Sequence, residues 1–155
     1  MSEAHPGPTP GFLVWRLSMK WRVAVDRALA PQGLTHAQYS LLASLLAVQR
    51  SGRQPTQREL ADTTGLEPLY VSKLARTLES AGLIERTPHP TDTRAVQLSL
   101  TEHGRETTQR AIGVVHQLLD QLLAPLGGRE SPRTEVFVRE LATLLDAPLD
   151  STIKE

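Results

Sequence analysis

The sequence predicts a mainly α-helical chain with a small β-hairpin, arranged as a winged helix-turn-helix flanked by dimerisation helices. Two observations predict this fold class. Most segments repeat apolar residues at helical spacing. One stretch, 94–100, alternates apolar and polar residues and follows the short apolar segment 83–86 across a turn-rich connection. A hairpin directly after two short helices is the order expected for a winged helix-turn-helix domain, which we place at 35–100.

The N-terminal sequence indicates a flexible arm followed by one long helix. Residues 1–10 are rich in proline and are expected to be flexible. From Phe12 to Leu29 apolar residues recur with helical spacing, and Pro31 and Gly33 end the helix.

Two capping boxes mark the next helix starts. Thr35 is followed by Gln38 and Thr56 by Glu59, and in each pair the side chains can bond to each other's backbone N–H groups. The segment 50–55 is expected to be a turn. Gly65 is expected to end the short helix that begins after Thr56, because glycine permits the sharp turn between two helices.

The helix expected over 67–80 carries the candidate recognition surface. One face is apolar and consists of Val71, Leu74, Ala75 and Leu78. The opposite face consists of Leu69, Ser72, Lys73, Arg76 and Thr77. Hydroxyls, cations and an apolar contact are the groups that meet base edges in the DNA major groove. A solvated helix face would show the same polar residues, so this helix alone does not decide the function.

The hairpin tip adds a second candidate contact. Asp92 stands two residues before Arg94 and can hold it by a charge-assisted hydrogen bond. The hairpin would form the wing of such a domain, and an arginine at its narrow tip suits the negative potential of the minor groove. An ordinary turn aspartate with a solvated arginine is the alternative.

Two helices are expected after the hairpin. Thr101 caps a long helix that reaches about Ala124, and Ser131 with Pro132 begins the last one. We assign 11–34 and 101–147 to a helical dimerisation region and 148–155 to a flexible tail. The winged domain cannot cover the apolar stripes of these helices, so we expect a homodimer. A two-fold partner would set two recognition helices about 34 Å apart.

Composition limits the alternatives. The 155 residues carry 17 basic and 17 acidic side chains and no cysteine. Disulfides and thiolate metal sites are therefore excluded, and we expect neither a metal nor another cofactor. No segment has the length and apolarity of a membrane span, and the N-terminus has no secretory pattern, so we expect no membrane association and a cytoplasmic location. No catalytic fingerprint is present, so we do not expect an enzyme.

The segment from Gly65 to Gly104 resembles the MarR family of winged-helix transcription regulators. The resemblance is carried by the helix end at 78–86, by Asp92-Thr93-Arg94, and by the stretch 98–104. It implies an obligate homodimer with interleaved terminal helices, bound to double-stranded DNA at a palindromic operator. By position, Ser72, Lys73 and Thr77 match recognition-helix residues, Arg94 the minor-groove arginine and Asp92 its partner. Leu69 and Thr77 depart from the residue types that the family often has there.

The resemblance also implies regulation by a small aromatic or phenolic effector. The candidate lining residues are Trp15, Arg16, Met19, His36 and Tyr39. An aromatic ring, a thioether and a cation near one junction could hold an apolar anion.

The leading hypothesis is therefore a homodimeric, sequence-specific repressor released from DNA by a small effector. The alternative is a winged-helix module that binds protein partners without DNA, which the neutral net charge favours slightly.

Overall fold

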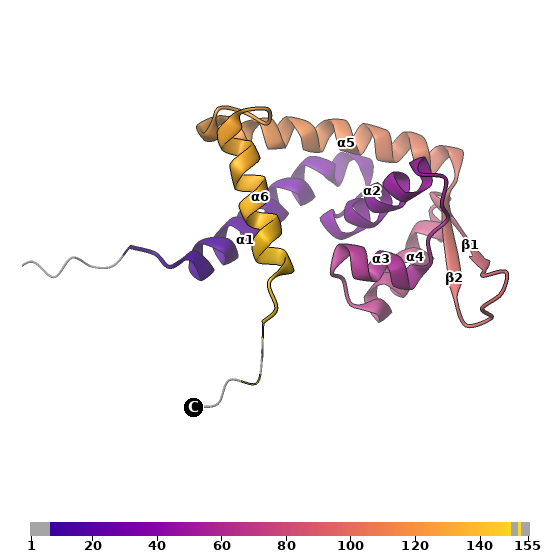
Figure 1. Ribbon diagram of the computed structural model, residues 1–155. Coiled ribbons are helices and arrows are strands. Elements are labelled where there is room, and N and C mark those ends of the chain that lie inside the picture. Colours follow the sequence, from indigo (N-terminus) through magenta and orange to yellow (C-terminus); the bar gives the residue numbers. More distant parts are fainter. Residues whose placement is uncertain (1–6, 150–151, 153–155) are drawn as a thin grey trace, which may run out of the picture. The chain divides into compact units, whose positions relative to one another are not determined.

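The computed structural model describes residues 7–149 and 152, which fall into two compact units divided after Val115. The first unit contains α1 (Pro10–Leu29), η1 (Ala30–Gln32), α2 (His36–Arg50), α3 (Gln57–Thr64), α4 (Pro68–Ser80), β1 (Ile84–Pro88), β2 (Val96–Leu100) and most of α5 (Glu102–Leu123) (Figure 1). The second unit contains the end of α5, then η2 (Ala124–Leu126) and α6 (Pro132–Asp146). The predicted fold class, helices around one antiparallel hairpin, is confirmed.

The predicted helix starts are confirmed by their hydrogen bonds. Both capping boxes form, at Thr35 with Gln38 and at Thr56 with Glu59. The first helix begins earlier than expected, because Thr9 caps it and Pro10 is its first residue. The end of the expected arm therefore belongs to this helix start, and residues 1–6 lie outside the described residues. Of the expected tail, 150–151 and 153–155 also lie outside them.

The core of the first unit lies between α2, α3, α4 and the hairpin. These elements contribute fully or almost fully buried side chains, and the C-terminal part of α1 adds Val25 and Leu29. The largest are Leu41, Leu42, Leu45, Leu46, Leu60, Leu78, Ile84 and Leu98. The apolar face predicted for 67–80 is buried as expected. Its burial turns the opposite face of α4 outward.

The hairpin is joined to the start of α3 by an additional backbone contact. β1 and β2 pair antiparallel, from Ile84 opposite Leu100 to Pro88 opposite Val96. The Leu98 N–H also donates to the Pro55 carbonyl at 3.0 Å, beside an isolated bridge between Thr56 and Gln97. The segment predicted only as a turn, 50–55, thus ends in a contact that anchors the wing to α3.

A close backbone approach fixes the start of α5 against β1. Thr101 donates its N–H to the Leu83 carbonyl at 3.1 Å, and its hydroxyl donates to the Gly82 carbonyl at 2.7 Å. A Cβ on Gly104 would lie 1.8 Å from the Leu83 carbonyl oxygen. Only glycine fits there, because that separation is far inside van der Waals contact.

Two helices carry many exposed apolar side chains. On α1 only Val25 and Leu29 are buried, and the exposed large apolar residues are Phe12, Leu13, Val14, Trp15, Leu17 and Val23. In the second unit α6 exposes Val136, Val138, Leu141, Leu144 and Leu145. Among the described residues no helix has the length and apolarity required to cross a membrane.

Candidate nucleic-acid interface and adjoining cavity

The turn between α3 and α4 is made by a glycine and an acidic cap. Gly65 has a φ of 73°, a left-handed conformation that ends α3. The carboxylate of Glu67 accepts hydrogen bonds from the Leu69 N–H at 3.1 Å and the Tyr70 N–H at 3.0 Å. This carboxylate occupies the anion-binding end of α4, so a DNA phosphate would not bind at these N–H groups. Contacts from α4 must come from its side chains.

The predicted recognition face of α4 is directed to solvent. Leu69 is 78% exposed, and Lys73, Arg76 and Thr77 are exposed as well. Ser72 is half-buried and accepts a hydrogen bond from the Arg76 guanidinium at 3.1 Å. The face therefore offers two cations and one apolar side chain beside hydroxyl groups.

The wing tip holds Asp92 and Arg94 as predicted from their spacing. Asp92 Oδ1 accepts a hydrogen bond from the Arg94 N–H at 3.1 Å and lies 3.5 Å from Arg94 Nε. The Arg94 side chain is 92% exposed. Its guanidinium is thus oriented by one carboxylate and otherwise open to a ligand.

A clamp that the sequence did not predict fastens the hairpin to both helices. Arg86 Nε donates to Gln57 Oε1 at 3.2 Å, and its Nη1 lies 3.6 Å from Glu79 Oε1. Glu79 Oε2 also accepts the Arg86 N–H at 3.2 Å. One arginine on β1 therefore contacts α3 and α4 together, which fixes the wing relative to the recognition face.

A shallow depression shows that the wing and the two helices form one surface. Its volume is about 160 Å³, and its lining comes from three places: the start of α3, Pro68 at the start of α4, and Arg94 to Val96 on the wing. Arg94 thus lies next to the beginning of both helices. A helix-turn-helix with a basic wing at its side defines the winged helix-turn-helix class of DNA-binding proteins.

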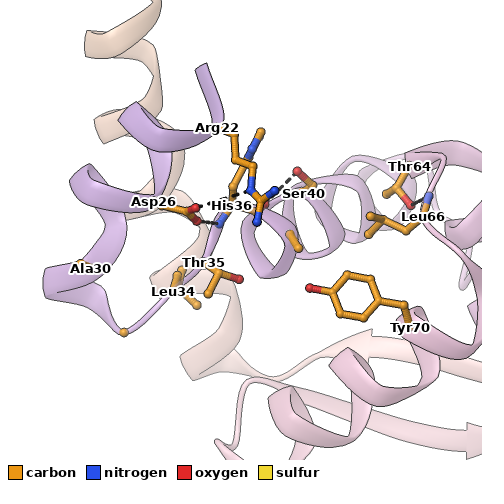
Figure 2. Close-up of a pocket in the computed structure, with 12 residues that line it drawn as sticks. Arg22, Asp26, Ala30, Leu34, Thr35, His36, Ser40, Thr64, Leu66 and Tyr70 are labelled. Atoms are coloured by element: carbon orange, nitrogen blue, oxygen red, sulfur yellow. Dashed lines mark hydrogen bonds and ion pairs between the residues drawn. The ribbon is translucent and has the colours of Figure 1, made fainter. Parts of the chain in front are cut away.

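A larger cavity of about 740 Å³ adjoins the other side of α4 (Figure 2). It is lined by the C-terminal half of α1, the segment 33–37, the end of α3 and Tyr70 of α4. Asp26 Oδ1 accepts the His36 N–H at 2.7 Å and so joins α1 to the first turn of α2. Arg22 Nε lies 3.9 Å from Asp26 Oδ2. Tyr70 faces these groups across the cavity, as Figure 2 shows.

Two titrating groups in this region are shifted by burial. Burial lowers the pKa of His36 below its usual value; Asp26 raises it in part, and Arg22 lowers it further. Burial raises the pKa of Tyr39. Both side chains therefore favour their neutral forms near pH 7.

The five residues predicted to line an effector site are not brought together. His36 lines the large cavity. Trp15, Arg16 and Met19 line a groove formed by α1 alone, and Tyr39 is not among the residues of either lining. Arg22, Asp26 and Tyr70 also line the large cavity, and they are not among the residues predicted from the sequence. Helical spacing places Tyr70, which follows Leu69, on a different side of α4 from the recognition face. The cavity that Tyr70 faces is determined by the packing of α4.

Comparison with known proteins agrees with this geometry. A family model described as "MarR family" matches residues 32–95. The uncharacterised HTH-type transcriptional regulator YdcH of Bacillus subtilis is 41% identical over 113 residues, which cover 73% of this chain and 77% of that protein. The transcriptional repressor MprA of Escherichia coli K12 is 30% identical over 143 residues, with coverages of 90% and 80%. The chain belongs to the MarR family and is a DNA-binding transcriptional regulator rather than an enzyme.

Solved structures show the same fold in complexes. The S. aureus MepR–DNA complex superposes with a TM-score of 0.77 at 25% identity, covering 89% of this chain and 97% of that one. CouR from Rhodococcus jostii RHA1, bound to p-coumaroyl-CoA, superposes with a TM-score of 0.74 at 26% identity, covering 99% and 100%. The DNA complex favours nucleic acid over a protein partner as the ligand of this fold.

Proposed function

We propose that this chain is a homodimeric repressor that binds a palindromic operator and is released by a small aromatic acid. Two observations carry the proposal: the outer face of α4 is exposed, and the exposed Arg94 of the wing lies beside the starts of α3 and α4. The relative MprA is a transcriptional repressor, which supports repression as the direction of regulation.

In this proposal α4 enters the major groove and the wing enters the minor groove. Lys73 and Arg76 supply hydrogen-bond donors for guanine edges or phosphates, and Ser72 and Thr77 supply hydroxyls. Arg94 is held by Asp92 so that its guanidinium extends from the tip. The narrow, negative minor groove attracts such a cation.

The test is the salt dependence of binding to a duplex selected from a random pool by the native protein. Arg94→Ala is expected to weaken binding at least several-fold and to reduce the slope of log affinity against log salt by about one, the value for one lost phosphate-type contact. Arg50→Ala is the matched control. Arg50 is also an exposed arginine, but it lies near the base of the hairpin rather than at its tip. Its neighbour Gln49 accepts the Leu100 N–H at that base. Equal effects of the two variants would contradict the proposed contact.

Dimerisation is proposed from the apolar side chains that each unit leaves uncovered. Phe12, Leu13, Val14 and Trp15 are consecutive, so they point to all sides of the first turns of α1, and each is more than half exposed. On α6, Leu144 is 65% and Leu145 86% exposed. Exposed apolar side chains in this number, on each unit separately, are typical of an obligate interface. A second copy of the chain would cover these side chains.

Sedimentation of two charge-introducing variants tests the dimer. Leu144→Glu is expected to give monomers, because it would bury a carboxylate in the apolar interface. Leu69→Glu is the matched control, since Leu69 is also an exposed leucine but belongs to the DNA-binding face. It is expected to remain dimeric and to lose DNA binding. A native protein that sediments as a monomer at micromolar concentration would overturn the proposal.

The large cavity is the proposed effector site. It touches α4 through Tyr70 and α1 through Arg22, whose guanidinium has, among the described residues, one ion-pair partner, Asp26 at 3.9 Å. An aromatic carboxylate could pair with Arg22 while its ring lies against Tyr70. Such a ligand releases DNA only if it binds better to a conformation in which the recognition helices no longer match the operator.

Titration with 4-hydroxybenzoate and salicylate tests this effector class. The ligands are expected to raise the melting temperature of the free protein and to weaken operator binding. Arg22→Gln should reduce both effects, and Arg27→Gln, on the same helix outside the cavity lining, should not. If neither acid changes the melting temperature or the affinity, the assignment to phenolic acids is wrong.

A further inference from the structure

The turn at the wing tip is closed by a histidine side chain. His89 Nδ1 accepts hydrogen bonds from the Thr91 N–H at 3.2 Å and from the Asp92 N–H at 3.0 Å. The His89 N–H donates to the Ala95 carbonyl at 3.0 Å, and the Ala95 N–H donates to the Asp92 carbonyl at 3.0 Å. The imidazole thus accepts backbone hydrogen bonds within the turn, as an aspartate or asparagine side chain does in many turns.

This geometry fixes the protonation state of the ring. Backbone N–H groups can only donate, so Nδ1 must carry a lone pair and the ring proton must reside on Nε2. A proton on Nδ1 would leave the Thr91 and Asp92 N–H groups without their acceptor, and of the three groups at Nδ1 only the Thr91 hydroxyl, 3.3 Å away, could accept the new N–H. The tip therefore requires a neutral imidazole.

The same hydrogen bonds connect His89 to the exposed arginine. Asp92, whose N–H is held by His89, in turn accepts the Arg94 N–H at 3.1 Å and lies 3.5 Å from Arg94 Nε. Arg94 is 92% exposed, and in the described part of the chain no other hydrogen bond or ion pair restrains it. The orientation of the guanidinium therefore depends on the position of Asp92.

We propose that His89 is a positioning residue for DNA binding: its neutral imidazole orders the wing tip so that Asp92 presents Arg94 to the minor groove, and protonation of Nδ1 releases this arrangement. The inference rests on the proposed contact between Arg94 and DNA. It makes the affinity for DNA depend on the protonation of one side chain.

The nearest charged residues along the chain belong to the same hairpin as His89. Asp92 and Arg94 lie in the tip, and Glu85 and Arg86 lie farther down β1, where Arg86 is engaged with Gln57 and Glu79. Among the residues that the structure describes, no hydrogen bond or ion pair joins the His89 imidazole to an element outside the hairpin. The acceptor role is therefore local to the tip.

Two substitutions at this position separate acceptor chemistry from general packing. In His89→Asn the amide oxygen Oδ1 is bonded to Cγ, as Nδ1 is in histidine, so the variant keeps an acceptor at this position that cannot be protonated near neutral pH. His89→Ala removes the acceptor. On the selected duplex, His89→Ala is expected to bind about ten-fold more weakly than the native protein and His89→Asn within about two-fold of it.

The pH profile is the second readout. On acidification the native protein is expected to lose affinity relative to His89→Asn, because a proton on Nδ1 removes the acceptor, whereas the amide oxygen of asparagine remains an acceptor. Other titrating groups, His36 included, affect both proteins equally. Parallel profiles would overturn the inference.

A measurement without DNA separates this inference from the proposed function. Imidazole nitrogen chemical shifts are expected to show the Nε2–H tautomer for His89, and the Thr91 and Asp92 amides are expected to exchange slowly in native protein and His89→Asn but fast in His89→Ala. Fast exchange in the native protein overturns the inference. If His89→Ala binds DNA like the native protein while Arg94→Ala does not, the wing contact stands and the positioning role fails. If Arg94→Ala also binds normally, the proposed wing contact itself is wrong.

Discussion

The imidazole of His36 has a pKa that is shifted by its surroundings in the fold. It lies at the first turn of α2, where Asp26 accepts its backbone N–H. Burial lowers the pKa of its imidazole, so the folded protein binds a proton there less readily than the unfolded chain.

This shift predicts a loss of stability in mild acid. A group whose pKa is lower in the folded state stabilises the protein above its unfolded pKa, near 6.5, and that contribution is lost as the pH falls below it. Between about pH 7.5 and about pH 5.5 the melting temperature of the native protein should therefore fall more than that of His36→Gln. Thermal melts followed by circular dichroism measure this difference. Curves with the same pH dependence would show that His36 does not contribute.

The exposed side chain of Leu69 predicts an apolar contact with DNA bases. Its side chain is 78% exposed on the face of α4 that we propose for the major groove, where the 5-methyl group of thymine is the matching apolar contact. Replacing the thymines of the selected duplex by uracil should weaken native binding about three- to four-fold for each lost methyl contact. Leu69→Ser should bind the two duplexes alike. Anisotropy titrations with both duplexes make the comparison, and equal sensitivity of the two proteins would exclude Leu69 as the contact.

At the scale of elements, the wing is held by backbone contacts and by one arginine. Pro55 and Thr56 pair with β2, Arg86 contacts α3 and α4, and the start of α5 lies against Leu83. These contacts connect segments distant in sequence, so the orientation of the wing depends on all of them.

Gly104 gives a sharp test of this packing. Gly104→Ala places a methyl group against the Leu83 carbonyl, and α5 must shift away from β1 to relieve the overlap. We expect a destabilisation of about 3 kcal/mol or more, the size seen for overpacked sites that cannot adjust. Gly113→Ala is the matched control on the same helix, because nothing lies within 4 Å of the added Cβ. It should stabilise the protein by about 0.5–1 kcal/mol through helix propensity. Urea unfolding measures both, and a mild effect at Gly104 would contradict the close approach.

At the scale of the whole molecule, stability and DNA binding should both depend on protein concentration. The exposed apolar residues of α1 and α6 are far more than a stable monomer normally presents. If a second copy covers them, dissociation removes stabilisation, and the melting temperature rises with concentration by mass action. We expect a ten-fold dilution in the micromolar range to lower the melting temperature by a few degrees. Calorimetry over such a series tests this, and a constant melting temperature would contradict an obligate dimer.

Much of the fold follows from local signals in the sequence. The capping boxes at Thr35 and Thr56, the glycine turn at Gly65 and the Ser131-Pro132 start each define a helix boundary through bonds made within a few residues. Helical spacing also identified the outer face of α4, because burial of one face of an amphipathic helix exposes the other. Asp92 and Arg94 are two residues apart, so their pairing needed no distant contact.

Tertiary structure decided what depends on residues far apart along the chain. The cavity joins Arg22, His36 and Tyr70 from three helices, and neither spacing nor periodicity determines which helices meet. The Arg86 clamp and the approach of Gly104 to Leu83 arise in the same way. The sequence by itself determined the local elements and the polar face, because those depend on neighbours within one helical turn. The packing of the helices decided the cavity, the fixed wing and the glycine requirement, because these depend on how separate elements fill space together.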